Sequence, residues 1–270
     1  MRRTLSFTKK NFIKVIRAPI FFVVALVFPI LYILLLTVIF KSVGGTNPED
    51  INQGNFLRYP ATVPGAMVLA SCLVMYFMAS TVSKERKSLT LKRLYASPMR
   101  TPEFLTGYAV VGFALGIAMF LVTYFGGWII AACFHDDYIP FGKGMLLIVS
   151  QMPIMLTLLF FGIIIGSFIA KGAPGICAIM IVCVGIVGGC FWVLDVASNG
   201  LQTFCRCLPF YPSVYIGRAI VGAKLSFKDN QYVWNSICNI GIGTIFAYLV
   251  VNIALANILF TIQSKRNMKE

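Results

Sequence analysis

The chain has 270 residues, of which 59% are hydrophobic and only 12% are charged, and its mean hydropathy is +0.85. Soluble domains carry roughly a quarter charged residues, so this composition excludes an ordinary water-soluble globular protein and indicates a lipid bilayer as the solvent. The formal net charge of +14 does not indicate a nucleic-acid-binding surface, because the basic residues cluster beside apolar runs, where membrane topology and anionic headgroups account for them.

The N-terminal segment is basic and has the pattern of an amphipathic helix. Residues 1–18 hold six basic side chains and no acid. On a helical wheel Lys10, Lys14 and Arg17 share one face, and apolar residues occupy the opposite face. This pattern predicts a helix that lies in the membrane interface, and the alternative is a basic flank that only orients the first span. We expect the segment to be retained, because the apolar run after it is too long for a cleavable signal peptide.

Six apolar runs are long enough to be transmembrane helices, since a span needs about 20 apolar residues. The predicted spans are residues 19–40, 60–82, 104–134, 144–170, 175–194 and 236–262. The predicted fold is therefore an all-α integral membrane protein, with residues 1–270 forming a single transmembrane domain.

The charges between these spans are distributed unequally. With six spans, one side of the membrane carries 16 Lys and Arg and three acids, whereas the other carries seven Lys and Arg and six acids. The segments on the basic side are residues 1–18, 84–106, 171–172 and 263–270. By the positive-inside rule this side is cytoplasmic. We therefore predict a multi-pass protein of the cytoplasmic (plasma) membrane with both termini in the cytoplasm.

Small residues recur inside the predicted spans. Gly112 and Gly116 are four residues apart, as are Gly162 and Gly166, and three glycines lie within residues 185–189 of the fifth span. Such positions allow helix backbones to approach closely. Packing within the chain is the favoured interpretation, and a dimer interface is the alternative.

The sequence gives no pattern of a metal site or a disulfide framework. Most of the eight cysteines lie in apolar runs, where cysteine behaves as a small hydrophobic residue. Cys205 and Cys207 share a polar setting, but they are too close for an ordinary bridge and too few for a zinc site. Their role is open, and we expect no metal in this chain.

The chemistry of the spans excludes several mechanisms. Apart from Asp195 at a span end, the predicted spans hold no ionisable residue, which argues against an ion-coupled transporter or a channel with charged rings. The chain also has no Walker A pattern, so it is not expected to hydrolyse ATP. If it performs work, a partner supplies the energy.

The basic segment after the second span is predicted to form a short helix, a break and a new helix. Residues 84–95 favour a helix, with Leu91 and Leu94 on one face. Pro98 ends it, and the sequence Thr-Pro-Glu at 101–103 supplies the capping residues of the next helix. A short helix at the inner membrane face suits docking of a cytoplasmic partner, and the alternative is a plain basic connector.

This segment and the layout resemble the permease subunit of ABC exporters of the type-two permease family. Members commonly carry Glu-Arg-Glu-x-Gly-Thr-Leu-Glu-x-Leu, followed by Ser-Pro and Glu-Phe, after the second span. The matching residues here are Glu85, Arg86, Thr90, Leu91, Leu94, Ser97, Pro98, Glu103 and Phe104. The chain departs from this pattern at Lys87, Leu89 and Lys92.

A second part of the resemblance lies before the last predicted span, where the family often shows Pro, Pro, Arg and Gly in that order. The counterparts here are Pro209, Pro212, Arg218 and Gly222. The resemblance implies an outer segment that re-enters the membrane without crossing it. The apolar and aromatic run 210–221 is consistent with this expectation.

The resemblance also implies partners and a coupling surface. The chain would pair with a second permease, identical or related, and with cytoplasmic ABC ATPase subunits that bind ATP and Mg, so this chain itself would need no cofactor. The candidate ATPase-coupling residues are Lys10, Lys14, Arg17, Glu85, Arg86, Thr90, Leu91, Leu94, Pro98 and Glu103. The expected substrate is amphiphilic: a drug, an antimicrobial peptide, a lipid or a glycan-linked lipid.

The alternative function is a membrane-embedded enzyme or assembly factor that acts on lipids. It would need a polar catalytic cluster at one membrane face. The candidates are His135 with Asp136 and Asp137, and Asp195 with Asn199. A solvated loop is the simpler interpretation of the first group.

Overall fold

The structure is a computed structural model that describes residues 2–16, 19–43, 59–87, 101–135, 138–169, 172–192, 194, 197–223 and 232–267. Its helices are α1 (Arg2–Ile16), α2 (Pro19–Val43), α4 (Tyr59–Lys87), α6 (Thr101–Phe134), α7 (Phe141–Phe168), α8 (Ala173–Val187), α9 (Asn199–Cys207), α10 (Phe210–Val221) and α11 (Ser236–Asn267). Among these residues no strand is present, which confirms the all-α prediction.

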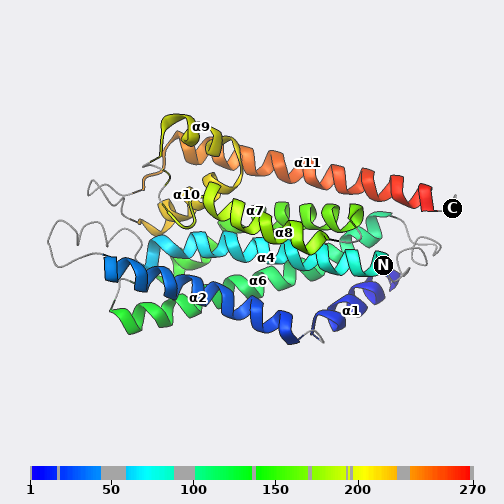
Figure 1. Cartoon of the computed structure of the whole chain (residues 1–270), viewed down its shortest axis with the longest axis horizontal. Helices are drawn as coiled ribbons and strands as arrows, with labels where there is room; N and C mark the ends of the chain where they lie inside the picture. The colour runs from blue at the N-terminus through cyan, green and yellow to red at the C-terminus, as the bar shows by residue number, and fades with distance from the viewer. Residues whose placement is uncertain are drawn as a thin grey trace.

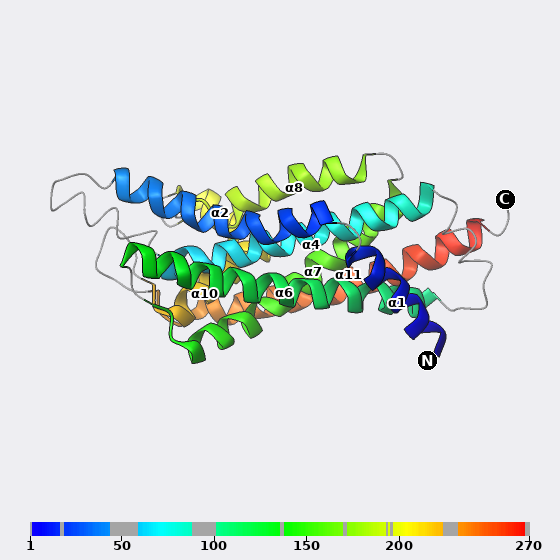
Figure 2. The same cartoon turned by 90° about the horizontal axis from the view of Figure 1, so that it is seen from below.

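The long helices run side by side along one axis (Figure 1). In two perpendicular views α1 lies at the same end of the bundle as the C-terminal end of α11, and we call this the proximal end (Figures 1 and 2). Helix α10 lies at the opposite end, beside the start of α4, and we call this the distal end. The polar clusters described below lie at these two ends.

Four helices are long and apolar enough to cross a membrane by length and composition: Pro60–Lys87, Pro102–Phe134, Phe141–Phe168 and Ser236–Ile262. Two shorter apolar helical stretches accompany them, Val27–Ile39 and Ala173–Val187. These helices confirm a multi-span membrane protein. The layout of exactly six crossings stays a prediction.

The predicted fifth span, residues 175–194, is wrong in its extent. Helix α8 ends at Val187, because Gly189 adopts a left-handed conformation with φ +65°. The N–H of Cys190 then donates to the Gly185 carbonyl at 2.9 Å, and the N–H of Gly189 donates to the Ile186 carbonyl at 3.2 Å. This pair of bonds is a Schellman motif, which terminates helices at glycine. Gly189 therefore ends α8 and does not serve helix packing inside a span.

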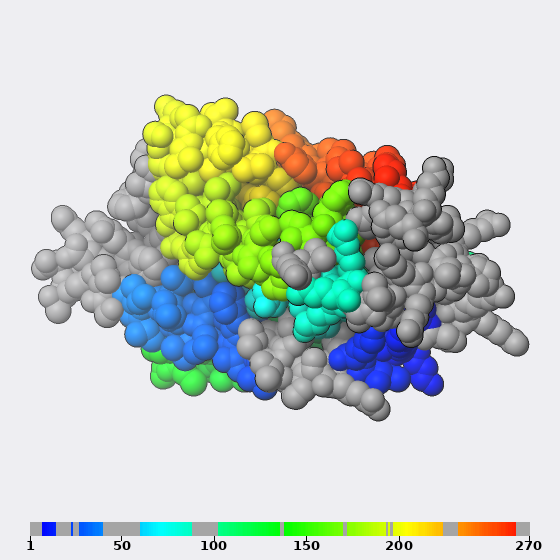
Figure 3. Space-filling view, turned by 45° about the vertical axis from the view of Figure 1, so that its right-hand side comes forward, coloured from blue at the N-terminus to red at the C-terminus, as the bar shows by residue number. Residues whose placement is uncertain are grey.

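Helix α4 forms the centre of the bundle. In Figure 3 only part of α4 (cyan) is visible, and α2 (blue) and α8 (yellow-green), which both contact α4, lie on the same face. On another side α7 packs directly on its backbone: a methyl group at Gly162 would lie 2.3 Å from the Met75 carbonyl oxygen, and one at Gly166 would lie 2.6 Å from that of Ala79. The glycine pair in α7 thus packs within the chain, as predicted.

Helix α11 differs from α4 in its surroundings. In its most apolar 18-residue window only 17% of the residues are buried, against 83% for α4. Large hydrophobic side chains such as Ile240, Val250 and Ile258 point away from the bundle. A helix that is apolar on all sides and packed on one suits a position facing lipid.

Candidate functional site

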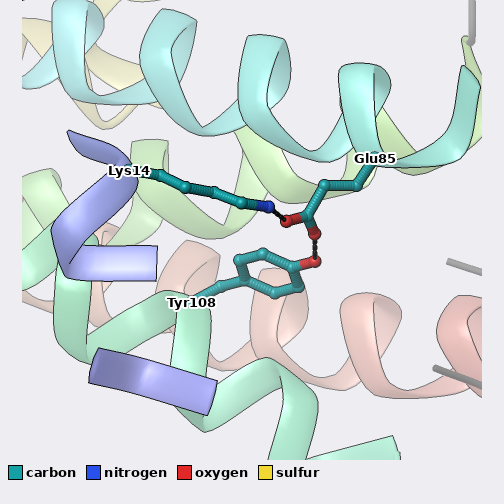
Figure 4. A network of polar contacts seen from close by, with 3 residues as sticks. All are labelled: Lys14, Glu85 and Tyr108. Atoms are coloured by element: carbon teal, nitrogen blue, oxygen red, sulfur yellow. Dashed lines mark hydrogen bonds and ion pairs between the residues drawn. The ribbon is translucent and has the colours of Figure 1, made fainter. Parts of the chain in front are cut away.

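A buried carboxylate at the proximal end joins three helices. Glu85, near the end of α4, is only 4% exposed. Its carboxylate accepts a hydrogen bond from the Lys14 ammonium group of α1, with which it forms an ion pair, and another from the Tyr108 hydroxyl of α6 (Figure 4). Charge-assisted bonds of this kind offset the free-energy cost of burying a carboxylate. We call these three residues the Glu85 junction.

The sequence of α1 explains how Lys14 reaches this position. Phe7 and Lys14 are two helical turns apart, so both face the bundle. The Phe7 ring packs edge-on against Phe104 and Tyr108, with centroid distances of 5.5 and 5.2 Å. Gly107 makes room for it, since a methyl group there would lie 2.5 Å from the ring. Aromatic packing thus holds α1 against α6, and the ion pair holds it against α4.

Asn11 lies one turn before Lys14 on the same face of α1. It is 2% exposed, and neither atom of its amide group has a hydrogen-bond partner in the described part of the chain. An unpaired buried amide costs on the order of 1–3 kcal/mol. Asn11 therefore adds no hydrogen bond between α1 and the other described residues.

Arg86 follows Glu85 and contacts a different helix. Its Nη1 group donates hydrogen bonds to the carbonyl oxygens of Ser167 and Phe168, the last residues of α7. The final carbonyls of a helix lack partners within the helix and carry a partial negative charge, so a guanidinium group stabilises them. Adjacent residues of α4 therefore fix α1 on one side and the end of α7 on the other.

The structure brings some of the predicted coupling residues together and separates others. Lys14, Glu85 and Arg86 lie at one site, whereas Lys10 is exposed and Glu103 is half-buried in the first turn of α6. The remaining candidates lie outside the described residues: Arg17, Thr90, Leu91, Leu94 and Pro98. A role in ATPase coupling stays a prediction for the whole set.

The segment before the last helix is helical, as the apolar run predicted. Pro209 precedes α10, Pro212 is buried in its first turn, and Gly222 ends the helix with φ +75°. Residues 211–218 are all buried, so α10 is packed inside the distal end. Whether it re-enters a membrane is not tested by these contacts and stays a prediction.

Arg218 in α10 is 1% exposed, and its described partners are neutral groups. Its Nε donates to the Ala61 carbonyl at 3.1 Å, its Nη2 to the Gly189 carbonyl at 2.9 Å, and its Nη1 to the Tyr232 hydroxyl at 3.4 Å. The guanidinium carbon also lies 5.7 Å from the centroid of the Tyr232 ring, within reach of a cation–π interaction. The sequence pointed to Arg218 but not to these partners.

A second buried polar pair at the distal end has no sequence signature. The Gln151 amide of α7 donates to the Ser213 carbonyl of α10 at 3.0 Å, and the Ser213 hydroxyl donates to the Gln151 side-chain oxygen at 2.6 Å. Each polar group thus satisfies the other across two helices. A lone glutamine in a long apolar run is the only signal that could have indicated this contact.

The structure describes only part of the other candidate chemistry. His135 is exposed, and Asp136, Asp137 and Asp195 lie outside the described residues. Within the described residues no group of three or more His, Cys, Asp and Glu could hold a metal ion.

The two cysteines of α9 differ in their environment. Cys205 is buried and Cys207 is exposed, although they are only two residues apart. Burial raises the pKa of the Cys205 thiol. Cys207 is therefore the accessible thiol of this pair, and Cys205 belongs to the packed face of the helix.

These features define a multi-span helical membrane protein that has a basic N-terminal helix tied to its central span. Residues 2–221 match the family model described as ABC-2 type transporter. The chain therefore belongs to the ABC-2 type transporter family, and this confirms the resemblance seen in the sequence. Among curated proteins none matches this chain.

Family membership sets the general role of the chain. It is a membrane component of a transport system and not itself an enzyme, and the family implies a partnership with an ABC ATPase subunit. This role does not support the alternative of a lipid-modifying enzyme.

Proposed function

We propose that this chain is the permease subunit of an ABC exporter. It moves an amphiphilic substrate, such as a drug, an antimicrobial peptide, a lipid or a glycan-linked lipid, across the cytoplasmic membrane. A separate ATPase subunit binds ATP and Mg, and a second permease, identical or related, completes the pore. Membership of the ABC-2 type transporter family supports this proposal.

The Glu85 junction is the observation that carries the coupling part of the proposal. Helix α1 lies at the edge of the bundle and exposes Lys9, Lys10 and the apolar Phe12 and Ile13. Helix α4 is the most buried of the candidate spans. Because Lys14 binds Glu85, a displacement of α1 is passed directly to the centre of the bundle. Glu85 then acts through α1, since a carboxylate that is 4% exposed has little surface for a partner.

Charge and chain direction support a cytoplasmic proximal end. The segments predicted on the cytoplasmic side hold 16 of the 23 basic residues. In the structure α1 and the C-terminal end of α11 lie at one end of the bundle, as an even number of crossings requires (Figure 1). A cytoplasmic ATPase would then meet α1 and the end of α4.

Co-expression with candidate ABC ATPases tests this function. The complex is purified in mild detergent and reconstituted, and ATP hydrolysis and substrate export are measured together. Glu85→Ala is expected to keep the ATPase bound and hydrolysing while export per ATP falls several-fold. Lys84→Ala, an exposed neighbour on α4, is the control and should leave this ratio unchanged. Failure of every ABC ATPase to co-purify with the wild-type chain would exclude the proposal.

A further inference from the structure

The end of α8 lies in a place where backbone carbonyls are difficult to satisfy. Helix α8 has 15 residues, which corresponds to a length of about 22 Å, whereas a hydrocarbon core is about 30 Å thick. It therefore ends before an apolar layer of that thickness is crossed. The last carbonyls of a helix have no partners within it, and an unpaired polar group in an apolar environment costs several kcal/mol.

Three side chains bind the carbonyls at this end: Trp192, which follows α8 in the chain, and Tyr32 and Arg218, which are distant in the sequence. The Trp192 indole N–H donates to the Ile186 carbonyl at 2.9 Å, and Arg218 donates to the Gly189 carbonyl at 2.9 Å. The Tyr32 hydroxyl of α2 donates to the carbonyl of Cys190. We call Tyr32, Trp192 and Arg218, with the carbonyls that they bind, the helix-end clasp.

Arg218 is the charged member of the helix-end clasp and the one that links the most elements. Besides Gly189 it binds the Ala61 carbonyl in the first turn of α4 and the Tyr232 hydroxyl before α11. A guanidinium group can serve several acceptors at once because its donors lie in one fixed plane. Its charge also suits the negative end of the α8 dipole. One side chain therefore joins α8, α10 and α4 and reaches the segment that leads into α11.

Close backbone packing supports the same arrangement. A methyl group at Gly65 of α4 would lie 3.1 Å from the Tyr32 hydroxyl oxygen and 3.2 Å from Cys190 Cα. One at Gly217 of α10 would lie 2.6 Å from Pro64 Cβ. The backbone of α4 thus lies directly against both the end of α8 and the arginine-bearing turn of α10.

We propose that Arg218 is a positioning residue that holds the end of α8 against α4 and α10, so that the distal end opens only when the helix-end clasp is broken. The inference stands on these contacts and does not require the exporter function. If the exporter function holds as well, the clasp closes the side of the bundle that faces away from the ATPase.

The native thiol of Cys190 reports on this end of α8. Cys190 is fully buried beside Gly189, and Cys177, also fully buried, lies near the start of the same helix. The full-length chain in lipid nanodiscs is treated with N-ethylmaleimide, and peptide mass spectrometry gives the alkylation rate of each cysteine. Opening of the clasp should expose Cys190 and leave Cys177 protected.

Arg218→Met keeps a long apolar side chain but removes all the donors. We expect it to accelerate alkylation of Cys190 at least about tenfold and to leave the rate at Cys177 unchanged. Arg218→Lys, which can serve fewer acceptors, should restore part of the protection. Arg206→Met, the same change at an exposed arginine of α9, is the matched control and should alter neither rate.

Two results would overturn the inference. One is an equal acceleration at Cys190 and Cys177 in Arg218→Met, because Arg218 would then stabilise the fold in general and would not position one end of α8. The other is unchanged protection of Cys190. If Arg218→Met does not fold, Tyr32→Phe removes a single hydroxyl and should accelerate Cys190 about threefold; the same rate as in the wild type would contradict the clasp. Export is not measured here, so loss of the proposed function leaves this outcome unaffected.

Discussion

The two ends of the bundle each bury a charge, but they compensate it in different ways. At the proximal end the Glu85 carboxylate meets the opposite charge of Lys14, whose side chain is 42% exposed. At the distal end the described partners of Arg218 are neutral oxygens: the carbonyls of Ala61 and Gly189 and the Tyr232 hydroxyl. The exposed Lys14 can exchange Glu85 for water, whereas two of the three described acceptors of Arg218 are backbone carbonyls, which move only with their helices. The proximal end can therefore adapt, whereas the distal end is held in place.

At both ends of the bundle an arginine donates hydrogen bonds to carbonyls at the C-terminal end of a helix. The two arginines differ in their surroundings. Arg86 binds the last carbonyls of α7 at the proximal end, and Arg218 binds a carbonyl just after α8 at the distal end. Because α7 and α8 run in opposite directions, their C-terminal ends lie at opposite ends of the bundle (Figure 1). Each therefore needs its own donor. Arg86 is half-buried beside a carboxylate, whereas Arg218 is fully buried.

The largest effect is expected at the contact between α4 and α7, on which both ends depend. Gly162→Val would place a side chain 2.3 Å from the Met75 carbonyl oxygen, which cannot move without shifting α4. We expect a loss of about 3 kcal/mol in the free energy of unfolding, seen as a lower Tm in detergent. Gly142→Val is the control, because no atom lies within 4 Å of a methyl group there. An equal Tm for the two variants would show that the two ends of the bundle do not depend on the contact between α4 and α7.

The Glu85 junction should respond unequally to loss of its two charges. Lys14→Met leaves a buried carboxylate with less compensation, whereas Glu85→Gln leaves a lysine that is already 42% exposed and can return to water. We expect a loss of about 2 kcal/mol in the free energy of unfolding for Lys14→Met and about 1 kcal/mol for Glu85→Gln. Denaturant unfolding of both variants and of the double variant measures the difference.

A larger loss of stability for Glu85→Gln than for Lys14→Met would contradict the role given to Lys14 at the proximal end. A larger loss from Glu85→Gln would mean that the carboxylate mainly supports Tyr108 and the start of α6, and that Lys14 adds little. The contact of Glu85 would then hold α4 against α6, and α1 would depend mainly on the packing of Phe7 against α6.

The outline of the fold followed from the sequence, whereas the contacts of the buried charges did not. Apolar runs of sufficient length predicted α4, α6, α7 and α11. The extent of α8 was missed because Gly188 and Gly189 were interpreted as packing residues, although glycine after an apolar run also signals a helix end. Arg218 stood out by family resemblance, but its partners at Ala61 and Gly189 are backbone carbonyls. Every residue has a backbone carbonyl, so the amino-acid sequence does not indicate which carbonyls Arg218 binds.

A smaller effect is expected at the buried polar pair of the distal end. Ser213→Ala removes the hydroxyl that binds the Gln151 side-chain oxygen at 2.6 Å but keeps the backbone carbonyl that accepts from the amide. We expect a loss of about 1 kcal/mol in the free energy of unfolding, measured by denaturant titration. Ser150→Ala is the control, since among the described residues that hydroxyl donates to the Leu147 carbonyl of its own helix. Equal stability of the two variants would argue that side-chain bonds between α7 and α10 do not hold the distal end.

The smallest expected effect concerns α9 and tests whether this helix belongs to the tightly packed part of the distal end. The experiment needs no substitution. Cys207 is exposed, whereas Cys205 is buried and burial raises the pKa of its thiol. Only the thiolate reacts with maleimide, so at pH 7.5 we expect Cys207 to be alkylated about tenfold faster or more. Because the pKa of Cys205 is raised, its alkylation should keep accelerating to a higher pH than that of an ordinary thiol. Peptide mass spectrometry between pH 7 and 10 measures both rates. Equal rates would show that α9 opens freely, and the held region would then end at α10 and its arginine.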